Sequence, residues 1–276
     1  MAEAVMTPRG PYRLRLIVRD GQWSAPLLDG ERAFAWQRLD GKVIIRAASE
    51  EGVELARFML ALDDDTASFH ERFARDRLLG PTARAFVGWR PLRLATVSHA
   101  VLRAICGQLI ESSRARALER RILRATGTDV ASRERLAAFS AAQLRSHGLA
   151  AGRAATLLRV CRSIDLERLR DLPGEDVARR LASERGIGPW SIGVIALEGL
   201  GRYDLAPIGD LALVKLASAL AGRWVETWET AELLEPYKEW QGLASELLLL
   251  GWTRGLVPGT DADRARFVRV RSRRAA

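Results

Sequence analysis

The stretch of sequence that decides the fold covers residues 181–220 and reads LASERGIGPWSIGVIALEGLGRYDLAPIGDLALVKLASAL. Between its first two segments of helical periodicity stands Gly186-Ile187-Gly188-Pro189-Trp190. Two glycines one residue apart let the backbone turn sharply and leave amide N–H groups open, and the positive dipole end of the next helix begins there. The pattern predicts a hairpin that holds a phosphate of a nucleic-acid backbone. A glycine-stopped helix with a tight turn is the alternative for the glycine pair alone.

A second loop follows this hairpin and ends in an acidic residue. Residues 204–210 separate the second helical segment from a third, and the loop closes with Gly209-Asp210. Asp210 is placed to cap the helix predicted over residues 211–221, and a cap alone would explain an aspartate there. A helix N-terminus also favours the ionised form of the carboxylate, so we expect Asp210 to be charged at neutral pH. The sequence therefore predicts a charged carboxylate that follows the hairpin closely along the chain.

The first ninety residues show strand patterning that the rest of the chain lacks. Apolar and charged residues alternate over residues 12–18 and again around Phe34 and Trp36, which is typical of half-buried strands. Asp40-Gly41 before the apolar run 43–45 predicts a β-hairpin. Ser49 and the two glutamates after it predict the start of a helix that extends to Leu62. We therefore expect a small α+β domain over residues 1–90.

The patterning becomes wholly helical after Pro91. Helical periodicity covers residues 97–125, 133–139, 140–147, 151–164, 175–185, 191–200, 211–221, 230–234 and 240–250. Ser140 and Gln143 form a capping box, and Gly148 is suited to stop that helix. The fold class is thus α+β, with an all-α domain over residues 91–258 and a basic tail over residues 259–276. A solvated end is the expected role of the tail, and phosphate contact is the alternative.

Composition and charge narrow the class of protein and partner. The 276 residues are 48% hydrophobic and 28% charged, which is typical of a globular protein and excludes wholesale disorder. The net charge of +9 favours a polyanionic partner, because neutralised phosphates release counterions. No apolar run is long enough to span a bilayer, and no signal peptide is recognised at the start. We expect a soluble, cytoplasmic protein.

The cysteines and histidines argue against a metal centre. Cys106 and Cys161 are too few and too far apart for an iron–sulfur cluster or a cysteine-rich zinc site. His70, His99 and His147 show no metal-ligand spacing. We therefore predict two buried, reduced thiols and no bound metal at side-chain ligands.

The hairpin and the aspartate loop together resemble the helix–hairpin–helix superfamily of base-excision DNA glycosylases. Asp210 follows Gly186 by 24 residues, which matches the AlkA-type branch, DNA-3-methyladenine glycosylase II, without a gap. Residues 104–110, AICGQLI, are similar to the helix end that enters the DNA in this family. Residues 148–153 and 172–174 follow the same layout, and residues 1–90 match the branch's extra domain, which resembles half of a TATA-binding-protein fold. The resemblance covers nearly the whole chain.

The resemblance implies a role for each matching residue. Asp210 would stabilise the positive charge that builds on the sugar as the N-glycosidic bond breaks, and would orient the attacking water. Trp190 stands where strand-cutting members have a Schiff-base lysine, so the resemblance implies a monofunctional enzyme with Trp190 as a stacking surface. Leu109 would fill the gap left by a flipped nucleotide, and Gln108 would approach the base. Core packing is the alternative for Trp190 and Leu109. The hairpin residues expected at the DNA are Gly186, Ile187, Gly188 and Ser191.

Two positions depart from the family's pattern. Val194 stands where the AlkA type has a pocket tyrosine, and Glu246 falls where a pocket tryptophan is expected. Trp240 or Trp252 is the alternative occupant of that second space. A less aromatic pocket stacks a cationic base more weakly, whereas a carboxylate attracts it or accepts a hydrogen bond from its edge. These departures leave the substrate range open.

The hairpin of this family also binds a monovalent cation in some members. The resemblance allows, without requiring, such an ion at the main-chain carbonyls of Ala182, Glu184 and Gly186. No other cofactor is implied.

The sequence thus predicts a monomeric, monofunctional DNA glycosylase that flips and hydrolytically excises alkylated purines from duplex DNA. One alternative is a glycosylase for an oxidised, deaminated or mispaired base. The missing cluster cysteines argue against its iron–sulfur branches, and Trp190 argues against the oxoguanine lyase branch. Another alternative is a non-catalytic lesion-binding protein, against which the placement of Asp210 counts.

Overall fold

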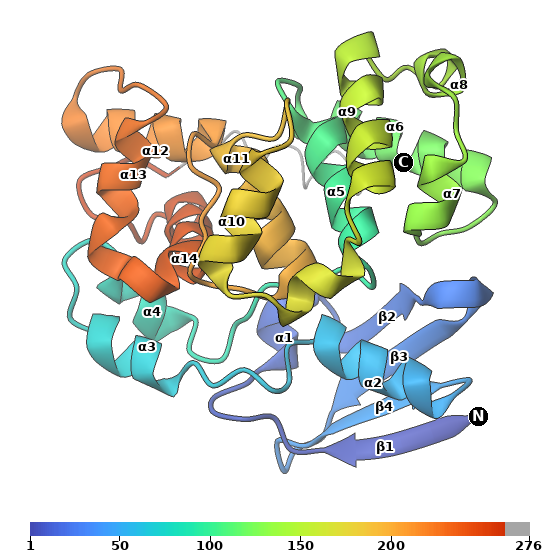
Figure 1. Ribbon diagram of the computed structural model, residues 1–276. Helices are drawn as coiled ribbons and strands as arrows, with labels where there is room; N and C mark the ends of the chain where they lie inside the picture. Colours follow the sequence, from blue (N-terminus) through green and yellow to red (C-terminus); the bar gives the residue numbers. More distant parts are fainter. Residues whose placement is uncertain (263–276) are drawn as a thin grey trace, which may run out of the picture.

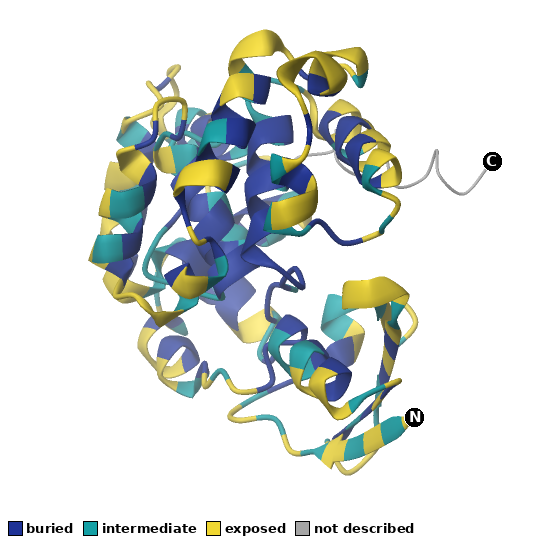
Figure 2. Cartoon of the chain, turned by 45° about the vertical axis from the view of Figure 1, so that its right-hand side comes forward, coloured by how far each residue is buried: buried dark blue, intermediate teal, exposed yellow. Residues whose placement is uncertain are grey.

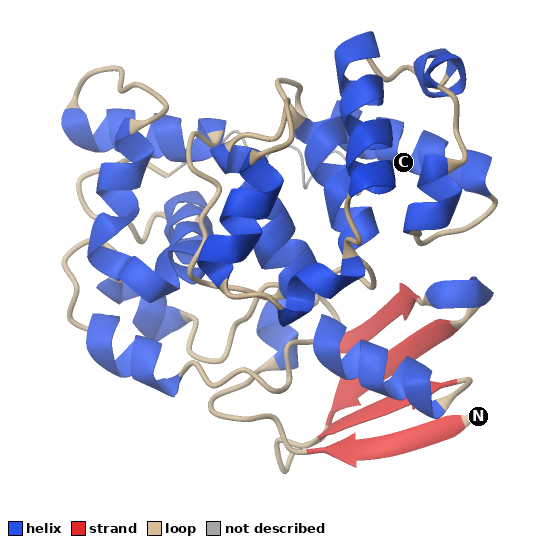
Figure 3. Cartoon of the chain, viewed as in Figure 1, coloured by secondary structure: helices blue, strands red, loops and turns tan. Residues whose placement is uncertain are grey.

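The computed structural model describes residues 1–262 and shows a four-stranded antiparallel sheet beside a larger helical body (Figures 1 and 3). The strands lie in the order β1-β4-β3-β2. Their bounds are β1 Ala2–Met6, β2 Gln22–Pro26, β3 Arg32–Gln37 and β4 Val43–Ala47. The architecture is mixed and mostly helical, in agreement with the predicted α+β class. The arginines of the basic tail, from residue 264 onward, lie outside the described residues.

Helices cover one face of the sheet and form the rest of the molecule. The longer ones are α2 Glu50–Met59, α5 Val97–Gly107, α6 Ser112–Thr126, α9 Ala151–Ser163, α10 Gly174–Ala182, α12 Leu211–Ala221 and α14 Gln241–Thr253. The shorter ones are α1 Leu14–Ile17, α3 Ala67–Phe73, α4 Gly80–Ala85, α7 Arg133–Ala137, α8 Ala141–Ser146, α11 Pro189–Ile195 and α13 Glu229–Leu234. Short segments of other helix types are η1 Leu28–Gly30, η2 Glu167–Asp171, η3 Ala196–Leu200 and η4 Glu235–Trp240.

Local sequence signals set most of the elements near the N-terminus. The predicted hairpin at Asp40-Gly41 is confirmed, because β3 and β4 pair antiparallel and Gly41 takes the positive φ that the turn requires. Ser49 caps α2 by accepting a 3.0 Å hydrogen bond from the Gly52 amide, as predicted. The capping box of α8 at Ser140 is confirmed as well.

The prediction of a strand over residues 12–18 is wrong. The segment forms the single turn α1 instead, with Leu14 fully buried. The side chain of Gln37 accepts a hydrogen bond from the Leu14 amide at 2.9 Å and donates one to the Tyr12 carbonyl at 3.1 Å. An amide side chain therefore satisfies backbone groups that a strand would have satisfied through a ladder.

Buried residues form three large clusters. Figure 2 shows the buried residues in dark blue, many of them in the central helices. One lies between the sheet and α2, and a second fills the space among α5 to α11. In the third, Phe69 of α3 and Leu79 pack with Leu213 of α12 and Leu247 of α14. Residues 67–85 thus pack with the C-terminal helices, although they lie within the first ninety residues.

One long helical segment predicted over residues 97–125 is also wrong, because the helix breaks in its middle. α5 ends at Gly107, and Gln108 leaves the helical conformation with φ −57° and ψ 124°. Leu109 then adopts a positive φ of 55°, which a leucine takes only at an energetic cost. The break produces an exposed turn between α5 and α6.

The two cysteines are free and buried, as predicted. Burial raises the pKa of the Cys106 and Cys161 thiols to about 12. Within residues 1–262, no helix combines the length and the apolar character that crossing a membrane requires.

A buried ionic network fixes α5 against α6. Glu119 of α6 accepts hydrogen bonds from His99 Nε2 at 3.0 Å, Arg103 Nη2 at 3.0 Å and Arg116 Nη1 at 3.1 Å. Arg103 continues the network to Glu198 in η3. Burial by itself would raise the pKa of Glu119, but the hydrogen bond from His99 and the charge of Arg103 hold it below its ordinary value. The network supports α5, the helix that ends just before Gln108.

We predict that Glu119→Gln lowers the free energy of unfolding by about 3 kcal/mol at pH 7, because it removes the buried carboxylate that Arg103, Arg116 and His99 share. The depressed pKa of Glu119 means that its stabilisation is present above the unfolded glutamate pKa and is lost as the pH falls through the folded-state value. The difference between the two proteins should therefore shrink in acid. Denaturant unfolding at several pH values measures both effects.

Glu54→Gln is the matched control, since Glu54 is exposed and forms a surface pair with Arg57. Its effect should stay below about 0.5 kcal/mol. Equal effects of the two substitutions would show that the Glu119 network adds no stability.

Candidate active site around Asp210

Asp210 is the first residue of the site, and donors engage both of its carboxylate oxygens. Oδ1 accepts hydrogen bonds from the amides of Ala212 at 2.8 Å and Leu213 at 3.4 Å, so the predicted cap of α12 is confirmed. Oδ2 accepts a hydrogen bond from Trp190 Nε1 at 2.9 Å. These donors stabilise the negative charge and fix the orientation of the carboxylate, while the residue stays partly open to solvent.

The loop before Asp210 lies against α11 because of a glycine. A Cβ atom at Gly193 would be 2.2 Å from backbone atoms of Ala206 and Pro207, a distance that no side chain tolerates. Further along, the Gly209 amide donates a 2.8 Å hydrogen bond to Thr230 Oγ1. Sequence reasoning missed Gly193, although a glycine inside a predicted helix is a signal of close packing.

Trp190 lies in the first turn of α11 and contacts both Asp210 and the end of α5. Its indole N–H reaches Asp210, and its ring lies over the end of α5, where a Cβ at Gly107 would be 2.7 Å from Cη2. The residue is partly exposed, so the ring is neither a plain core side chain nor a free surface group. The hydrogen bond between Trp190 and Asp210 was not predicted from the sequence.

The turn between α5 and α6 is bound to the hairpin through Gln108. Gln108 Nε2 donates hydrogen bonds to the Gly186 carbonyl at 2.8 Å and to Ser191 Oγ at 3.0 Å. Arg153 Nη1 donates to the Gln108 carbonyl at 3.1 Å. Leu109 is fully exposed at the tip, which excludes the alternative of a core leucine.

The hairpin itself has an open and a closed part. Gly186 has a φ of 89° and packs so closely on α9 that a Cβ there would lie 2.5 Å from Thr156 Oγ1. No atom lies within 4 Å of a Cβ built on Gly188, so this position is open to a partner. The side chains of Ile187 and Ser191 are buried, and any contact of these two residues with a partner is left to their backbone.

Glu184 anchors the hairpin to the neighbouring helices. Its carboxylate accepts hydrogen bonds from Ser163 Oγ at 2.8 Å, Arg159 Nε at 3.1 Å and Arg180 Nη1 at 3.2 Å. Burial by itself raises the pKa of Glu184, but these hydrogen bonds lower it below its ordinary value. The hairpin is thus held in place by ionic contacts.

The described residues contain no cluster of three His, Cys, Asp or Glu side chains that could hold a metal ion. Of the hairpin carbonyls, that of Gly186 accepts the Gln108 amide and that of Glu184 accepts the Ile187 amide at 3.0 Å. A monovalent cation at these carbonyls stays a prediction.

Two further residues were predicted for the pocket, Val194 and Glu246. Val194 lies in α11 and packs partly buried against the second cluster, and Glu246 lies partly buried in α14. Trp240 stacks on Tyr203 with ring centroids 5.8 Å apart, and buried Trp252 donates to the Asp261 carbonyl. Both tryptophans belong to the third cluster, as do Ala206 and Leu213 on either side of Asp210, so their alternative role beside Trp190 stays a prediction.

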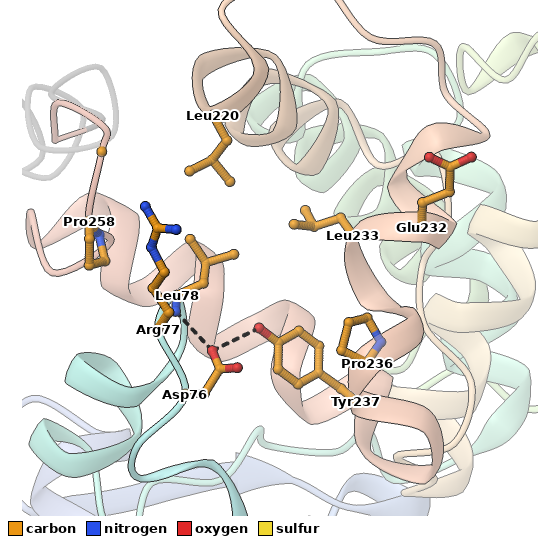
Figure 4. A pocket seen from close by; sticks show the side chains of 10 residues that line it. Asp76, Arg77, Leu78, Leu220, Glu232, Leu233, Pro236, Tyr237 and Pro258 are labelled. Atoms are coloured by element: carbon orange, nitrogen blue, oxygen red, sulfur yellow. Dashed lines mark hydrogen bonds between the residues drawn. The ribbon is translucent and has the colours of Figure 1, made fainter.

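A cavity of about 500 Å³ lies elsewhere, between the turn at residues 76–78 and the helices α12, α13 and η4 (Figure 4). Asp76 there accepts hydrogen bonds from the Leu78 amide at 2.9 Å and from Tyr237 Oη at 3.2 Å. None of the residues predicted for the site lines this cavity. It therefore has no part in the site around Asp210.

Comparison with known proteins identifies the fold. No protein-family model matches the chain. A Bacillus subtilis (strain 168) protein named DNA-3-methyladenine glycosylase is 25% identical over 223 residues, which are 75% of this chain and 74% of that relative. The structure of a 3-methyladenine DNA glycosylase from Archaeoglobus fulgidus matches with a TM-score of 0.75 and 18% identity, over 91% of this chain and 98% of that one.

A second solved structure is an 8-oxoguanine glycosylase/lyase from Clostridium acetobutylicum in complex with double-stranded DNA. It matches with a TM-score of 0.70 and 17% identity, over 91% of this chain and 98% of that one. The chain therefore has the helix–hairpin–helix glycosylase fold and a homologue named DNA-3-methyladenine glycosylase.

We predict that Gly193→Ala lowers the free energy of unfolding by about 1–3 kcal/mol, because the new Cβ forces α11 away from the loop at Ala206. Gly188→Ala is the matched control, with an ordinary φ of −105° and open space around its Cβ. Its effect should remain within about 0.5 kcal/mol. Thermal or denaturant unfolding of both variants is the measurement, and a silent Gly193→Ala would argue against the close contact.

Proposed function

We propose that this chain, which has the fold of helix–hairpin–helix DNA glycosylases, excises damaged bases from duplex DNA in base-excision repair. We further propose alkylated purines of the 3-methyladenine type as substrates and hydrolysis without strand cleavage as the reaction. The observation that carries the proposal is the hydrogen-bonded pair of Asp210 and Trp190. It places a fixed carboxylate beside a half-buried indole, a side chain that has no amine. The named homologue supports the alkylated substrate.

In this proposal Asp210 acts on the sugar and on water. The N-glycosidic bond breaks with both of its electrons passing to the base, and positive charge develops on the sugar. The carboxylate stabilises that charge and accepts a proton from the water whose oxygen bonds to the sugar carbon. A purine alkylated on a ring nitrogen already carries positive charge, so it leaves as a neutral base. No strong general acid is then required.

Trp190 supports the absence of strand cleavage. A Schiff base with the sugar requires an amine, and an indole has none. Lys215 stands five residues beyond Asp210 in α12, where its side chain is exposed to solvent. The indole face offers a stacking surface to an electron-poor base, while its N–H holds Asp210.

DNA binding is proposed to use the exposed turn and the hairpin together. Leu109 fills the gap that a flipped nucleotide leaves, at a cost of a few kcal/mol for unstacking. Gly186 and Gly188 bring the backbone close to a phosphate. A protein that handles one distorted site needs no second copy, so we propose a monomer. A monovalent cation at the carbonyls of residues 182, 184 and 186 is part of this proposal.

We predict that Asp210→Asn reduces base release at least about 100-fold, because a neutral amide cannot stabilise the cationic sugar. Binding to duplex DNA should persist, since the hairpin and Leu109 remain. The assay measures bases freed from methylated duplex DNA and, separately, strand breaks formed without heat or alkali. Asp204→Asn serves as the control, because Asp204 lies in the same loop but pairs with Arg202.

Release of methylated purines by the wild type alone, without strand breaks, would support the proposal in full. Release of only oxidised or mispaired bases would show that the substrates belong to another class of damaged base, while the proposed reaction would still hold. Binding without any release from a wide lesion panel would favour the non-catalytic alternative.

We predict that Leu109→Ala slows excision about 10-fold from fully paired duplex, because the vacated space in the stack is no longer filled. A lesion in single-stranded DNA should be excised at nearly the wild-type rate, since nothing has to be unstacked. Leu39→Ala provides the control, because Leu39 is equally exposed but lies in the turn between β3 and β4. Equal rates for both variants on paired DNA would refute the role of Leu109.

A further inference from the structure

Two large aromatic side chains are exposed in the loop that joins α12 to α13. Trp224 is 63% exposed and Trp228 is 62% exposed. An exposed tryptophan leaves a large apolar surface in contact with water, and exposed aromatic groups mark places where a partner binds. Neither residue has a role in the site described above.

Residues on either side of Trp228 contact the loop that carries Asp210. Thr227 contacts Gly209, since a Cβ at Gly209 would lie 3.4 Å from Thr227 Cβ. Two residues after Trp228, Thr230 Oγ1 accepts the 2.8 Å hydrogen bond from the Gly209 amide. The chain segment around Trp228 is thus attached to the residue that directly precedes Asp210.

The α12–α13 loop is also held in a defined conformation. Arg223 forms an ion pair with Glu229, and Glu229 accepts a hydrogen bond from the Glu226 amide at 2.5 Å. The Trp228 carbonyl accepts the Ala231 amide at 3.0 Å. Trp228 is therefore presented to solvent by an ordered turn rather than by a free end.

A second exposed apolar side chain, Leu109, is connected to Asp210 by a different route, through the hairpin and Trp190. Leu109 follows Gln108, which binds Gly186 and Ser191 next to Trp190. Trp190 in turn binds Asp210. The exposed side chains of Leu109 and Trp228 are thus both connected to the Trp190–Asp210 pair, one through the hairpin and the other through Gly209.

We propose that Trp228 stacks on a base that neighbours the extruded nucleotide and so positions the DNA over Asp210. The inference rests on the proposed function. Glu226 and Glu232 are exposed in the same segment, and their charge disfavours contact with phosphates. Stacking on a base face is compatible with nearby carboxylates, because it neutralises no phosphate. Trp228 is accordingly a positioning residue rather than a catalytic one.

The test uses the full chain and a duplex that contains a tetrahydrofuran abasic analogue, so that binding is measured without turnover. Trp228→Ala should weaken the Kd about 10-fold, and Trp228→Phe should restore much of the affinity. The slope of log Kd against log salt should stay that of the wild type, because stacking releases no counterions. The quenching of tryptophan fluorescence by the DNA should fall in Trp228→Phe.

Trp224→Ala and Trp224→Phe are the matched controls. Trp224 is equally exposed, but the residue after it is bound to Ser218 by a 3.0 Å hydrogen bond, eight residues along the chain from Asp210. The Kd of these variants should remain within about twofold of the wild-type value, because they keep the Trp228 stack. Equal unfolding midpoints across the set show that the substitutions leave the fold intact.

The outcomes separate the two proposals. Wild-type affinity and wild-type quenching in the Trp228 variants would overturn the stacking role, as expected for a surface that binds another protein. Excision could be normal in that case, and the proposed function would stand. Weakened binding in the Trp228 variants, with no excision by the wild type, would instead support stacking and overturn the glycosylase activity.

Discussion

The close approach of α11 to the loop at Ala206 is the constraint on which the rest of the site depends. Only a glycine at position 193 lets two backbones lie this close. The contact brings the first turn of α11 level with the start of α12, so that the Trp190 indole N–H meets Asp210. A carboxylate at a helix end is common, but this packing gives it a fixed partner on one side.

The same packing joins parts that are distant in the sequence. Gly107 leaves room for the Trp190 ring, and the Gln108 side chain is hydrogen-bonded to the hairpin, so the end of α5 is packed against the start of α11. The ionic network around Glu119 holds α5 against α6. The exposed turn and the carboxylate are therefore positioned relative to each other by buried contacts rather than by the loops themselves.

Local chemistry explains what could be predicted from the sequence and what could not. The cap at Asp210, the capping box at Ser140 and the hairpin at Gly41 follow from residue types at fixed short spacings. The turn at Leu109 was hidden inside an uninterrupted helical periodicity. The hydrogen bond from Trp190 to Asp210 joins residues twenty positions apart, and only tertiary packing decides it.

The left-handed backbone at Leu109 restricts which amino acids the tip can carry. Glycine or asparagine would adopt that conformation more easily, but neither offers the same apolar volume. Valine and isoleucine offer the volume, yet their branching at Cβ is the least compatible with a positive φ. Leucine is a compromise between these demands. A designer who transplants this turn to another scaffold must therefore carry over the flanking helix ends that impose the conformation, because the side chain alone would not preserve it.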